Sequence, residues 1–310
     1  MNILLSGSTG FVGNNFKKYL LETGNSYLIF DLTREDLSKD ETYLLSQIDS
    51  HSIDCVIHLA GLAHDIKRTL SGDAYTMVNF ELTKNFYNAF ILSKAQKFIF
   101  ISSVKAVADS ADGMLTEANI PIPQSYYGKS KLLAEEYILS LNLSDSKCMY
   151  ILRPCMIHGP GNKGNLNLLY KIISKGIPYP LAAFENKRSF LSIENLCFVI
   201  SELLERNDIP SGIYNVADNE ALSTNELIKL IATASDRKPK LWKINPGLIR
   251  SLAKLGDLLK LPLTTERLNK LTDNYIVDNS KIRLALGKEF PVQARDGIMT
   301  TIKSFQGVDK

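Results

Sequence analysis

The sequence predicts an α/β protein: a doubly wound parallel sheet followed by a smaller lobe. Short apolar runs alternate with segments of helical periodicity through the first half of the chain. The runs are apolar throughout, which is typical of strands covered on both faces. A glycine-rich turn joins the first run to the first helix. Because crossovers between parallel strands are right-handed, helices are expected on both faces of the sheet.

The apolar runs give five expected strands, at residues 3–5, 27–30, 55–60, 98–101 and 149–152. The first helix follows the glycine turn and is expected to end at Gly24, which suits the C′ position. Further helices are expected over residues 75–94 and from about Tyr126 onward. The stretch from Asp31 to Asp54 has room for only one helix, so the connection there is expected to be short.

The pattern changes after Pro154, where glycines and prolines become frequent. Helices are expected near residues 166–174, 194–206 and 224–234, separated by short strands such as 213–216. Ser223 and Glu226 fit a capping box at the start of the last of these helices. The expected units are residues 1–157 and a lobe of residues 158–310, with segments near 190–217 returning to the first unit.

The composition is that of a globular protein. Of 310 residues, 45% are hydrophobic, and 36 basic and 33 acidic residues leave a net charge of +3. This excludes a disordered or fibrous chain and gives no reason to expect a nucleic-acid or membrane partner. We see no spanning apolar stretch and no signal-peptide pattern, so a cytoplasmic protein is expected. Free, buried thiols are expected at Cys55, Cys148, Cys155 and Cys197.

The first candidate site is a glycine triplet, Gly7, Gly10 and Gly13, between a strand and a helix. This spacing allows a tight turn, close approach of a pyrophosphate and close packing of the helix, so it indicates a dinucleotide. Asp31 follows 18 residues after the last glycine, at the end of the next strand. A carboxylate there accepts hydrogen bonds from the adenosine ribose and favours NAD. Arg34 suits a 2′-phosphate and keeps NADP as the alternative.

The second candidate site combines a serine pair with a helical Tyr–Lys pair. Tyr127 and Lys131 are four residues apart and therefore share a helix face. A nearby ammonium and a nicotinamide cation are both expected to lower the pKa of the tyrosine and make it a usable base. Ser102 and Ser103 stand at the carboxyl end of the fourth strand, the edge where ligands bind in open α/β sheets.

These motifs, in this order, resemble those of the extended short-chain dehydrogenase/reductase superfamily. More narrowly, the chain resembles the NAD-dependent epimerase/dehydratase family acting on nucleotide sugars, over nearly its whole length. The fold implied is of the Rossmann type. Further matching segments are residues 54–61, Asp36–Leu37, Asn79, residues 152–154 with 158–161, residues 187–195 and residues 277–287. His158 and Ala108 replace a tyrosine and a glycine of the family, and the short segment after the second strand suggests an altered adenine pocket.

The resemblance implies a set of binding residues. The cofactor is expected to contact Gly7, Ser8, Thr9, Gly10, Phe11, Val12, Gly13, Asp31, Asp36, Leu37, Leu59, Ala60, Gly61, Asn79, Ser102, Lys131 and Pro154. The substrate is expected to contact Ser103, Tyr127, Asn165, Arg188 and Arg267. Arg188 would pair with the diphosphate of the nucleotide. Arg267 is either a second diphosphate partner or an ordinary surface charge.

The reaction implied is hydride transfer at C4 of the sugar, with Tyr127, Lys131 and Ser103 as catalytic residues. The 4,6-dehydratases carry Asp-Glu after the strand-end hydroxyl residue, whereas Val104 and Lys105 stand here. Two readings remain. One is an NAD-dependent 4-epimerase of a UDP-hexose or UDP-N-acetylhexosamine in surface-polysaccharide synthesis. The other is an NAD(P)H-dependent 4-ketoreductase of a UDP-4-keto-6-deoxy-N-acetylhexosamine.

The run Arg153–Asn195, which contains Asn186–Ser189, especially resembles proteins from N-acetylated UDP-sugar pathways in polysaccharide synthesis, where both activities occur. Asp31 favours NAD and therefore the epimerase. A protein that binds NAD(P) but serves a regulatory role is the third reading. A homodimer is implied by the family, through a helix bundle that includes the helix of Tyr127.

Overall fold

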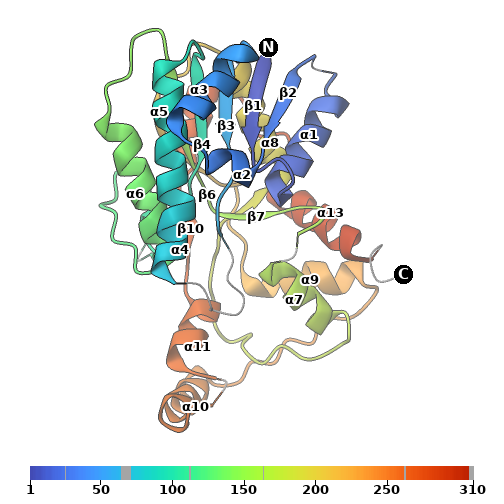
Figure 1. Ribbon diagram of the computed structural model, residues 1–310. Helices are drawn as coiled ribbons and strands as arrows, with labels where there is room; N and C mark the ends of the chain where they lie inside the picture. The colour runs from blue at the N-terminus through green and yellow to red at the C-terminus, as the bar shows by residue number, and fades with distance from the viewer. Residues whose placement is uncertain (25, 64–70, 112, 163, 262, 307–310) are drawn as a thin grey trace.

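The computed structural model describes residues 1–306 except 25, 64–70, 112, 163 and 262. Its centre is a six-stranded, all-parallel sheet in the order β2-β1-β3-β4-β6-β9 (Figure 1). The strands are β1 (Asn2–Ser6), β2 (Leu28–Leu32), β3 (Cys55–His58), β4 (Lys97–Ile101), β6 (Cys148–Pro154) and β9 (Gly212–Val216). The five expected strands are all present, and the predicted fold class is confirmed.

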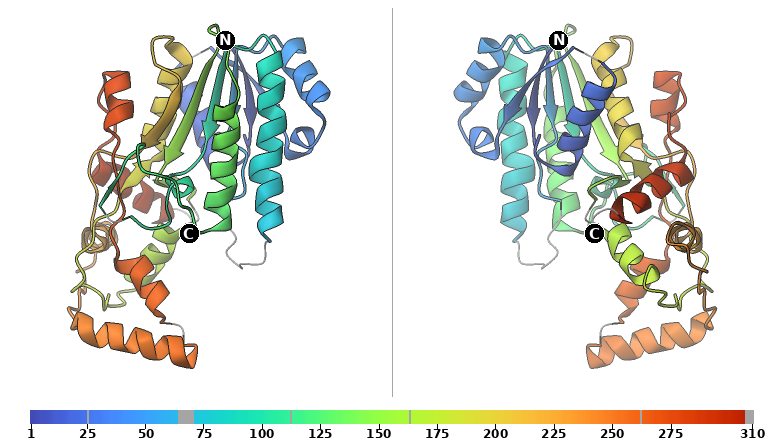
Figure 2. Two further views of the ribbon diagram at one scale, coloured as in Figure 1. Left: turned by 90° about the vertical axis from the view of Figure 1, so that its left-hand side faces the viewer. Right: turned by 90° about the vertical axis from the view of Figure 1, so that its right-hand side faces the viewer.

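Helices cover both faces of this sheet (Figures 1 and 2). Ile3 and Leu5 of β1 enter one core together with residues of α1 (Phe11–Glu22) and α8 (Ile193–Glu205). Leu4 points to the other face, into a core shared with α3 (Glu41–Ser50), α5 (Leu82–Leu92) and α6 (Tyr126–Ser140). Successive side chains of a strand alternate between faces, so apolar residues are required at every position. This is why the strands read as continuous apolar runs.

The connection between β2 and β3 is short, as expected, but it holds two helices instead of one. These are α2 (Arg34–Leu37) and α3. Thr33 and Asp36 form a capping box around the single turn of α2, and Asp40 caps the start of α3. Each cap starts a new helix, which divides the segment.

The helix expected over residues 75–94 is a helical run with a change of pitch inside it. It consists of α4 (Gly72–Thr76), a π-helical turn η1 (Met77–Glu81) and α5. Such π-turns are rare and occur often at functional sites. The expected end of α1 is confirmed, because Gly24 adopts a φ of +70° just after the helix.

The second lobe is built from short elements below the carboxyl edge of the sheet (Figure 2). The helices expected after Pro154 are present as α7 (Asn165–Ile173), α8 and α9 (Thr224–Ala234). Of these, α8 covers the main sheet, and α9 carries the expected capping box. The expected strand near 213–216 is β9, which joins the main sheet beside β6. No helix is expected from the sequence pattern after residue 234. The structure has α10 (Pro246–Leu259), α11 (Thr265–Thr272), α12 (Ser280–Leu286) and α13 (Ala294–Gln306). The remaining elements are η2 (Val104–Ala106), β5 (Met114–Leu115) with β10 (Ile276–Val277), and β7 (Met156–His158) with β8 (Phe190–Ser192).

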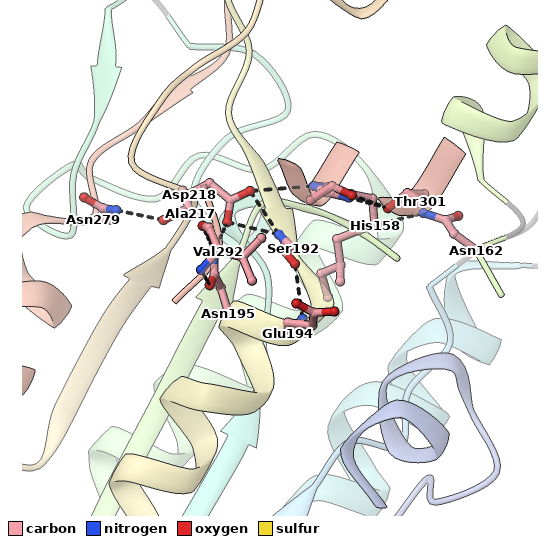
Figure 3. Close-up of polar contacts among 12 residues, drawn as sticks. His158, Asn162, Ser192, Glu194, Asn195, Ala217, Asp218, Asn279, Val292 and Thr301 are labelled. Carbon is pink, nitrogen blue, oxygen red and sulfur yellow. Dashed lines mark hydrogen bonds and ion pairs between the residues drawn. The ribbon is translucent and has the colours of Figure 1, made fainter. Parts of the chain in front are cut away.

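A buried polar cluster around His158 ties this lobe together (Figure 3). His158 Nδ1 lies 2.9 Å from Thr301 Oγ1 of α13, and its Nε2 lies 3.6 Å from a carboxylate oxygen of Asp218. The Asp218 carboxylate also accepts hydrogen bonds from the Ser192 amide at 3.0 Å and from Asn195 Nδ2 at 2.7 Å. The histidine that departs from the family pattern is therefore a structural residue that joins β7, α8 and α13.

The four cysteines are free; Cys55, Cys155 and Cys197 are buried, as expected, whereas Cys148 is only half-buried. In the part of the chain that the structure describes, no helix is long and apolar enough to cross a membrane.

Candidate active site

The glycine triplet forms a cradle that side chains would fill. Gly7 has a φ of +73°, and a Cβ atom there would lie 2.6 Å from the Ala60 amide nitrogen. At Gly13, a Cβ atom would lie 2.4 Å from the Gly7 carbonyl oxygen. Gly10 is the N-cap of α1 and contributes no side-chain cap, so the helix presents backbone N–H groups at this end. The cradle fits the pyrophosphate of a dinucleotide, with the positive end of the α1 dipole behind it.

Asp31 lies in β2 opposite Leu5, one residue before the strand ends. Its exposed carboxylate forms an ion pair with Lys17 Nζ of α1 at 2.9 Å. Lys17, which the sequence pattern did not single out, faces Asp31 from the turn of α1 beyond the glycine cradle. A ribose bound at Asp31 would therefore meet a carboxylate already held by an ammonium group.

Asp36 and Leu37 hold α2 in place. The Asp36 carboxylate accepts hydrogen bonds from the Thr33 amide at 2.9 Å and from the Tyr43 hydroxyl at 2.9 Å. The hydrogen bonds from Thr33 hold the pKa of Asp36 below its ordinary value. Leu37 is fully buried in the core under α3. Both side chains therefore have a local structural role. Because the Leu37 side chain has no exposed surface, it is not available to contact an adenine ring.

Asn79 fixes the loop after β3. From the π-helical turn η1, its Oδ1 accepts the Leu62 amide at 2.7 Å, and its Nδ2 donates to the Leu62 carbonyl and to Ser130 Oγ, both at 3.0 Å. Gly61 lies beside it, because a Cβ atom there would be 3.2 Å from Asn79 Oδ1 and 3.1 Å from Lys131 Nζ. The segment Leu59–Gly61 is thereby held next to the lysine expected to act on the cofactor.

Tyr127 and Ser103 meet at the carboxyl end of β4. Ser103 lies two residues after the end of β4 and caps η2, and a hydrogen bond from its hydroxyl to the Tyr127 oxygen favours the phenolate. Gly128 makes this meeting possible, because a Cβ atom there would lie 2.3 Å from the Lys105 carbonyl oxygen. Only a glycine lets the start of α6 approach η2 this closely, a role that sequence analysis missed.

Lys131 is buried one helical turn beyond Tyr127. Its Nζ donates to the Ile101 carbonyl at 2.8 Å and lies 4.6 Å from the centre of the Phe100 ring. Burial lowers the pKa of Lys131 to about 8, and the opposing charge of Glu135 limits the shift. The ammonium group is therefore present at neutral pH and is held at the Ile101 carbonyl, beside the Phe100 ring.

We expected the ammonium of Lys131 to help lower the pKa of Tyr127. In the protein alone, the pKa of Tyr127 is raised instead. The surrounding residues desolvate the phenolate and raise the pKa of Tyr127 to about 12, despite the hydrogen bond from Ser103. Tyr75 and Glu135 add to this rise, while the ammonium of Lys131 is bonded to the Ile101 carbonyl. Any lowering must come from the positive charge of an oxidised nicotinamide.

The comparisons with known proteins agree with this geometry. Residues 3–217 match the NAD dependent epimerase/dehydratase family. The chain belongs to this family. It is an NAD-dependent enzyme of the nucleotide-sugar epimerase/reductase class, and NAD is its cofactor.

Two relatives and one solved structure illustrate the likeness. This chain is 32% identical to a UDP-glucose 4-epimerase of Vibrio cholerae, over 98% of this chain and 95% of that protein. It is 29% identical to the N-acetyl-alpha-D-glucosaminyl-diphospho-ditrans,octacis-undecaprenol 4-epimerase of Escherichia coli O157:H7, over 76% of this chain and 73% of that one. The UDP-glucose 4-epimerase structure from Thermotoga maritima shares the fold, with a TM-score of 0.76 at 20% identity and full coverage of both chains.

A buried charge network, which the sequence patterns did not predict, follows Tyr127 and Lys131 along α6. Glu135 follows Lys131 by one helical turn and accepts hydrogen bonds from Arg153 Nε at 3.0 and 3.1 Å. Ser102 also donates its hydroxyl to Glu135, so this predicted cofactor residue is engaged below the site. Glu135 and Arg153 are both almost fully buried, and Arg153 Nη1 has no hydrogen-bond partner among the described residues. Pro154 continues β6 directly after this arginine and is buried.

The predicted substrate residues of the second lobe are spread over several elements. Asn165 is exposed at the start of α7. Arg188 is half-buried and donates from Nε to the Asp273 carbonyl at 3.2 Å. Burial lowers the pKa of Arg188, and the charge of Asp273 opposes the shift. Arg267 is exposed on α11, where it lines a hollow of about 570 Å³ that α10 borders. The structure does not place Arg267 beside Tyr127 or Ser103.

Proposed function

We propose that this enzyme is a UDP-sugar 4-epimerase that acts on a UDP-hexose or UDP-N-acetylhexosamine in surface-polysaccharide synthesis. The observation that carries the proposal is the cluster of Tyr127, Ser103 and Lys131 at the carboxyl edge of the sheet, opposite the glycine cradle. Its likeness to the UDP-glucose 4-epimerase over nearly the whole length of both chains supports the same reaction. Val104 and Lys105 occupy the positions where a dehydratase carries its acid and base, so water elimination is not proposed.

In the proposed mechanism, Tyr127 accepts the proton of the C4 hydroxyl group, and Ser103 donates a hydrogen bond to the same oxygen. The buried ammonium of Lys131, which lies beside Gly61, is proposed to bind the ribose of the cofactor. NAD, when bound, supplies a reversible hydride acceptor at C4 and a positive charge beside the phenol. For epimerisation, the 4-keto sugar turns over in the site, so that the hydride returned to C4 would arrive on its opposite face, and Tyr127 returns the proton to the C4 oxygen. The second lobe must therefore hold the diphosphate while leaving the sugar free to rotate, and Arg188 is the proposed anchor.

The test is to purify the enzyme, denature it and assay the supernatant for nicotinamide nucleotide. Near-stoichiometric NAD, followed by interconversion of a UDP-glucose/UDP-galactose pair or of the N-acetylated pair, would support the proposal. The lipid-diphosphate-linked N-acetylglucosamine belongs in the same panel, as a competing substrate class. An enzyme that is isolated without nucleotide and oxidises NADH or NADPH only with a UDP-4-keto sugar is a 4-ketoreductase, and the proposal fails.

We also propose that the enzyme divides at about residue 157 into a cofactor unit and a substrate lobe, with residues 190–217 returning to the former. Residues 1–157 and 158–310 would then meet across the active site.

A cytoplasmic homodimer is proposed as well. The exposed Leu133 and Leu139 of α6 and Leu92 at the end of α5 support a contact between copies there. Sedimentation of Leu133→Glu against the unaltered enzyme tests it, because a true interface would give a monomer.

A further inference from the structure

Helix α10 exposes an unusual stripe of leucines. Leu248, Leu252, Leu255 and Leu259 recur at intervals of four, three and four residues, so they lie on one face of the helix. Their side chains are 45–57% exposed, and the neighbouring Leu258 is 78% exposed. Single exposed leucines are ordinary on protein surfaces, but a continuous stripe marks an interaction site.

The stripe is not the face by which α10 packs on the protein. Ile249, Ala253 and Gly256 form that packed face, and a Cβ atom at Gly256 would lie 1.7 Å from the Leu263 carbonyl oxygen. At 100° per residue, the leucine stripe is turned by roughly a quarter of the circumference from the packed face. Figures 1 and 2 show α10 at the extreme end of the second lobe, away from the sheet. Nothing in the described part of the chain folds over the leucines.

The segment around α10 also concentrates positive charge. Residues 236–261 hold seven basic and two acidic residues, a net charge of +5, whereas the whole chain carries only +3. On the helix itself, Arg250 and Lys254 lie on the side away from the leucine stripe, and the Arg250 guanidinium lies 5.7 Å from the centre of the Phe184 ring. The acidic Asp257 is engaged, because its carboxylate accepts the amide of Thr265 at 3.0 Å. The rest of the chain is therefore slightly acidic, and this segment is strongly basic.

We propose that the leucine stripe of α10 docks on an anionic phospholipid bilayer. A helix with an apolar stripe, basic residues on its polar face and no length to span a membrane lies in the plane of the interface. The +5 segment is attracted to anionic headgroups and orients α10 toward them. A second copy of the chain is disfavoured as the occupant, because a two-fold contact on this face would bring two +5 segments together. The overall charge balance, which argued against a membrane surface, conceals this local concentration.

The test is co-sedimentation of the whole enzyme with vesicles at low ionic strength. Vesicles of phosphatidylglycerol and phosphatidylcholine in equal parts are expected to bind it, and vesicles of phosphatidylcholine alone to bind it far less. The double variant Leu252→Gln with Leu255→Gln should lower the partition coefficient roughly tenfold or more, because two buried side chains are lost. Leu284→Gln is the matched control, since Leu284 is 82% exposed on α12 and should have no effect. Trp242, the single tryptophan, precedes α10 and should shift its fluorescence to the blue on binding.

Two results would overturn the proposal. One is equal sedimentation with both kinds of vesicle or with neither. The other is a double variant that binds like the unaltered enzyme, since the leucines would then play no part. Sedimentation equilibrium without vesicles completes the test: a dimer that the double variant dissociates would identify a second copy as the occupant instead. Circular dichroism of each variant excludes misfolding. The inference is independent of the proposed epimerase activity, which needs no vesicles.

Discussion

The active-site edge of the sheet and the α10 end of the second lobe are built on opposite principles. At the sheet edge, Lys131 and Glu135 are buried on one face of α6, and each is bonded to a group on a neighbouring strand. At the far end, a core of only four buried residues supports α10, and its leucines face solvent. The first region works through fixed positions and desolvated charges. The second works through surface that the fold leaves uncovered. Each should therefore respond differently to substitution.

The largest expected effect is at the sheet edge. Tyr127→Phe removes the proposed proton acceptor while keeping the ring, and should lower kcat by about 10²- to 10⁴-fold. Unfolding stability and NAD content should change little, because the phenol oxygen is bonded only within the site. Tyr126→Phe is the matched control, since the adjacent Tyr126 is exposed and should leave kcat unchanged. Equal losses in the two variants would point to a defect of α6 rather than to loss of a proton acceptor.

The second effect is on stability. Glu135→Ala leaves the guanidinium of Arg153 buried without its counter-charge, at an expected cost of about 3–5 kcal/mol in unfolding free energy. Replacing both partners with leucine should recover most of that loss, because neither charge is then buried. Chemical denaturation of the three proteins measures the difference. If the single variant loses less than about 1 kcal/mol, the pair is hydrated and the sheet edge is less rigid than we infer.

Replacing Glu135 should also change the pH profile of kcat. Its charge raises the pKa of Lys131, which burial otherwise lowers. In Glu135→Gln, the alkaline fall in activity should therefore begin at a lower pH than in the unaltered enzyme, because Lys131 loses its proton earlier. A pH profile of kcat measures this shift, and an unchanged profile would limit Glu135 to a purely structural role.

Sequence patterns predicted the parts of the site that local spacing determines. The glycine triplet and the Tyr127–Lys131 pair each lie within one turn or helix, so their geometry follows from the chain itself. The network of Glu135 depends on Arg153, which is 18 residues away on a strand. The one available signal was the spacing of Tyr127, Lys131 and Glu135 at intervals of four. Tertiary packing likewise decided that Leu37 is buried in the core.

The second lobe was harder to predict for a different reason. Its helices α10 and α11 are short of core contacts, so their apolar residues do not distinguish buried from exposed faces. Leu252 and Ile249 look equivalent in the sequence, yet only Ile249 is buried. The direction in which α10 faces is determined by the close approach of Gly256 to Leu263, which no periodicity reveals.

A third expected effect is on the pH dependence of unfolding stability, which depends on the buried side chain of His58. His58 is buried between Ser6 Oγ at 2.6 Å and Thr83 Oγ1 at 2.9 Å, and burial lowers its pKa to about 3. Thr83 donates its own proton to the Asn79 carbonyl, so it accepts from Nε2 of the neutral ring. The unfolded chain takes up this proton near pH 6.5 but the folded protein does not, so stability is lost as the pH falls from about 6.5 toward 3.

This loss should reach roughly 1.4 kcal/mol per pH unit for His58 alone. His58→Gln removes the titrating group and should make the unfolding free energy depend less on pH between 7 and 5. His51→Gln, at a partly exposed position, should leave the dependence as it is. Parallel slopes for His58→Gln and the unaltered enzyme would show that His58 titrates normally and that water reaches this part of the sheet.

The smallest expected effect is at α10, where the comparison between the two regions is sharpest. Leu255→Gln removes an apolar side chain that packs on little within the chain, so unfolding stability should change by no more than about 0.5 kcal/mol. Leu203→Ala on α8, at a fully buried position, should cost about 2–5 kcal/mol. Denaturation midpoints in the absence of lipid separate the two. A loss above about 1 kcal/mol for Leu255→Gln would mean that the stripe is covered by part of the chain, and the leucines would then not be free for a bilayer.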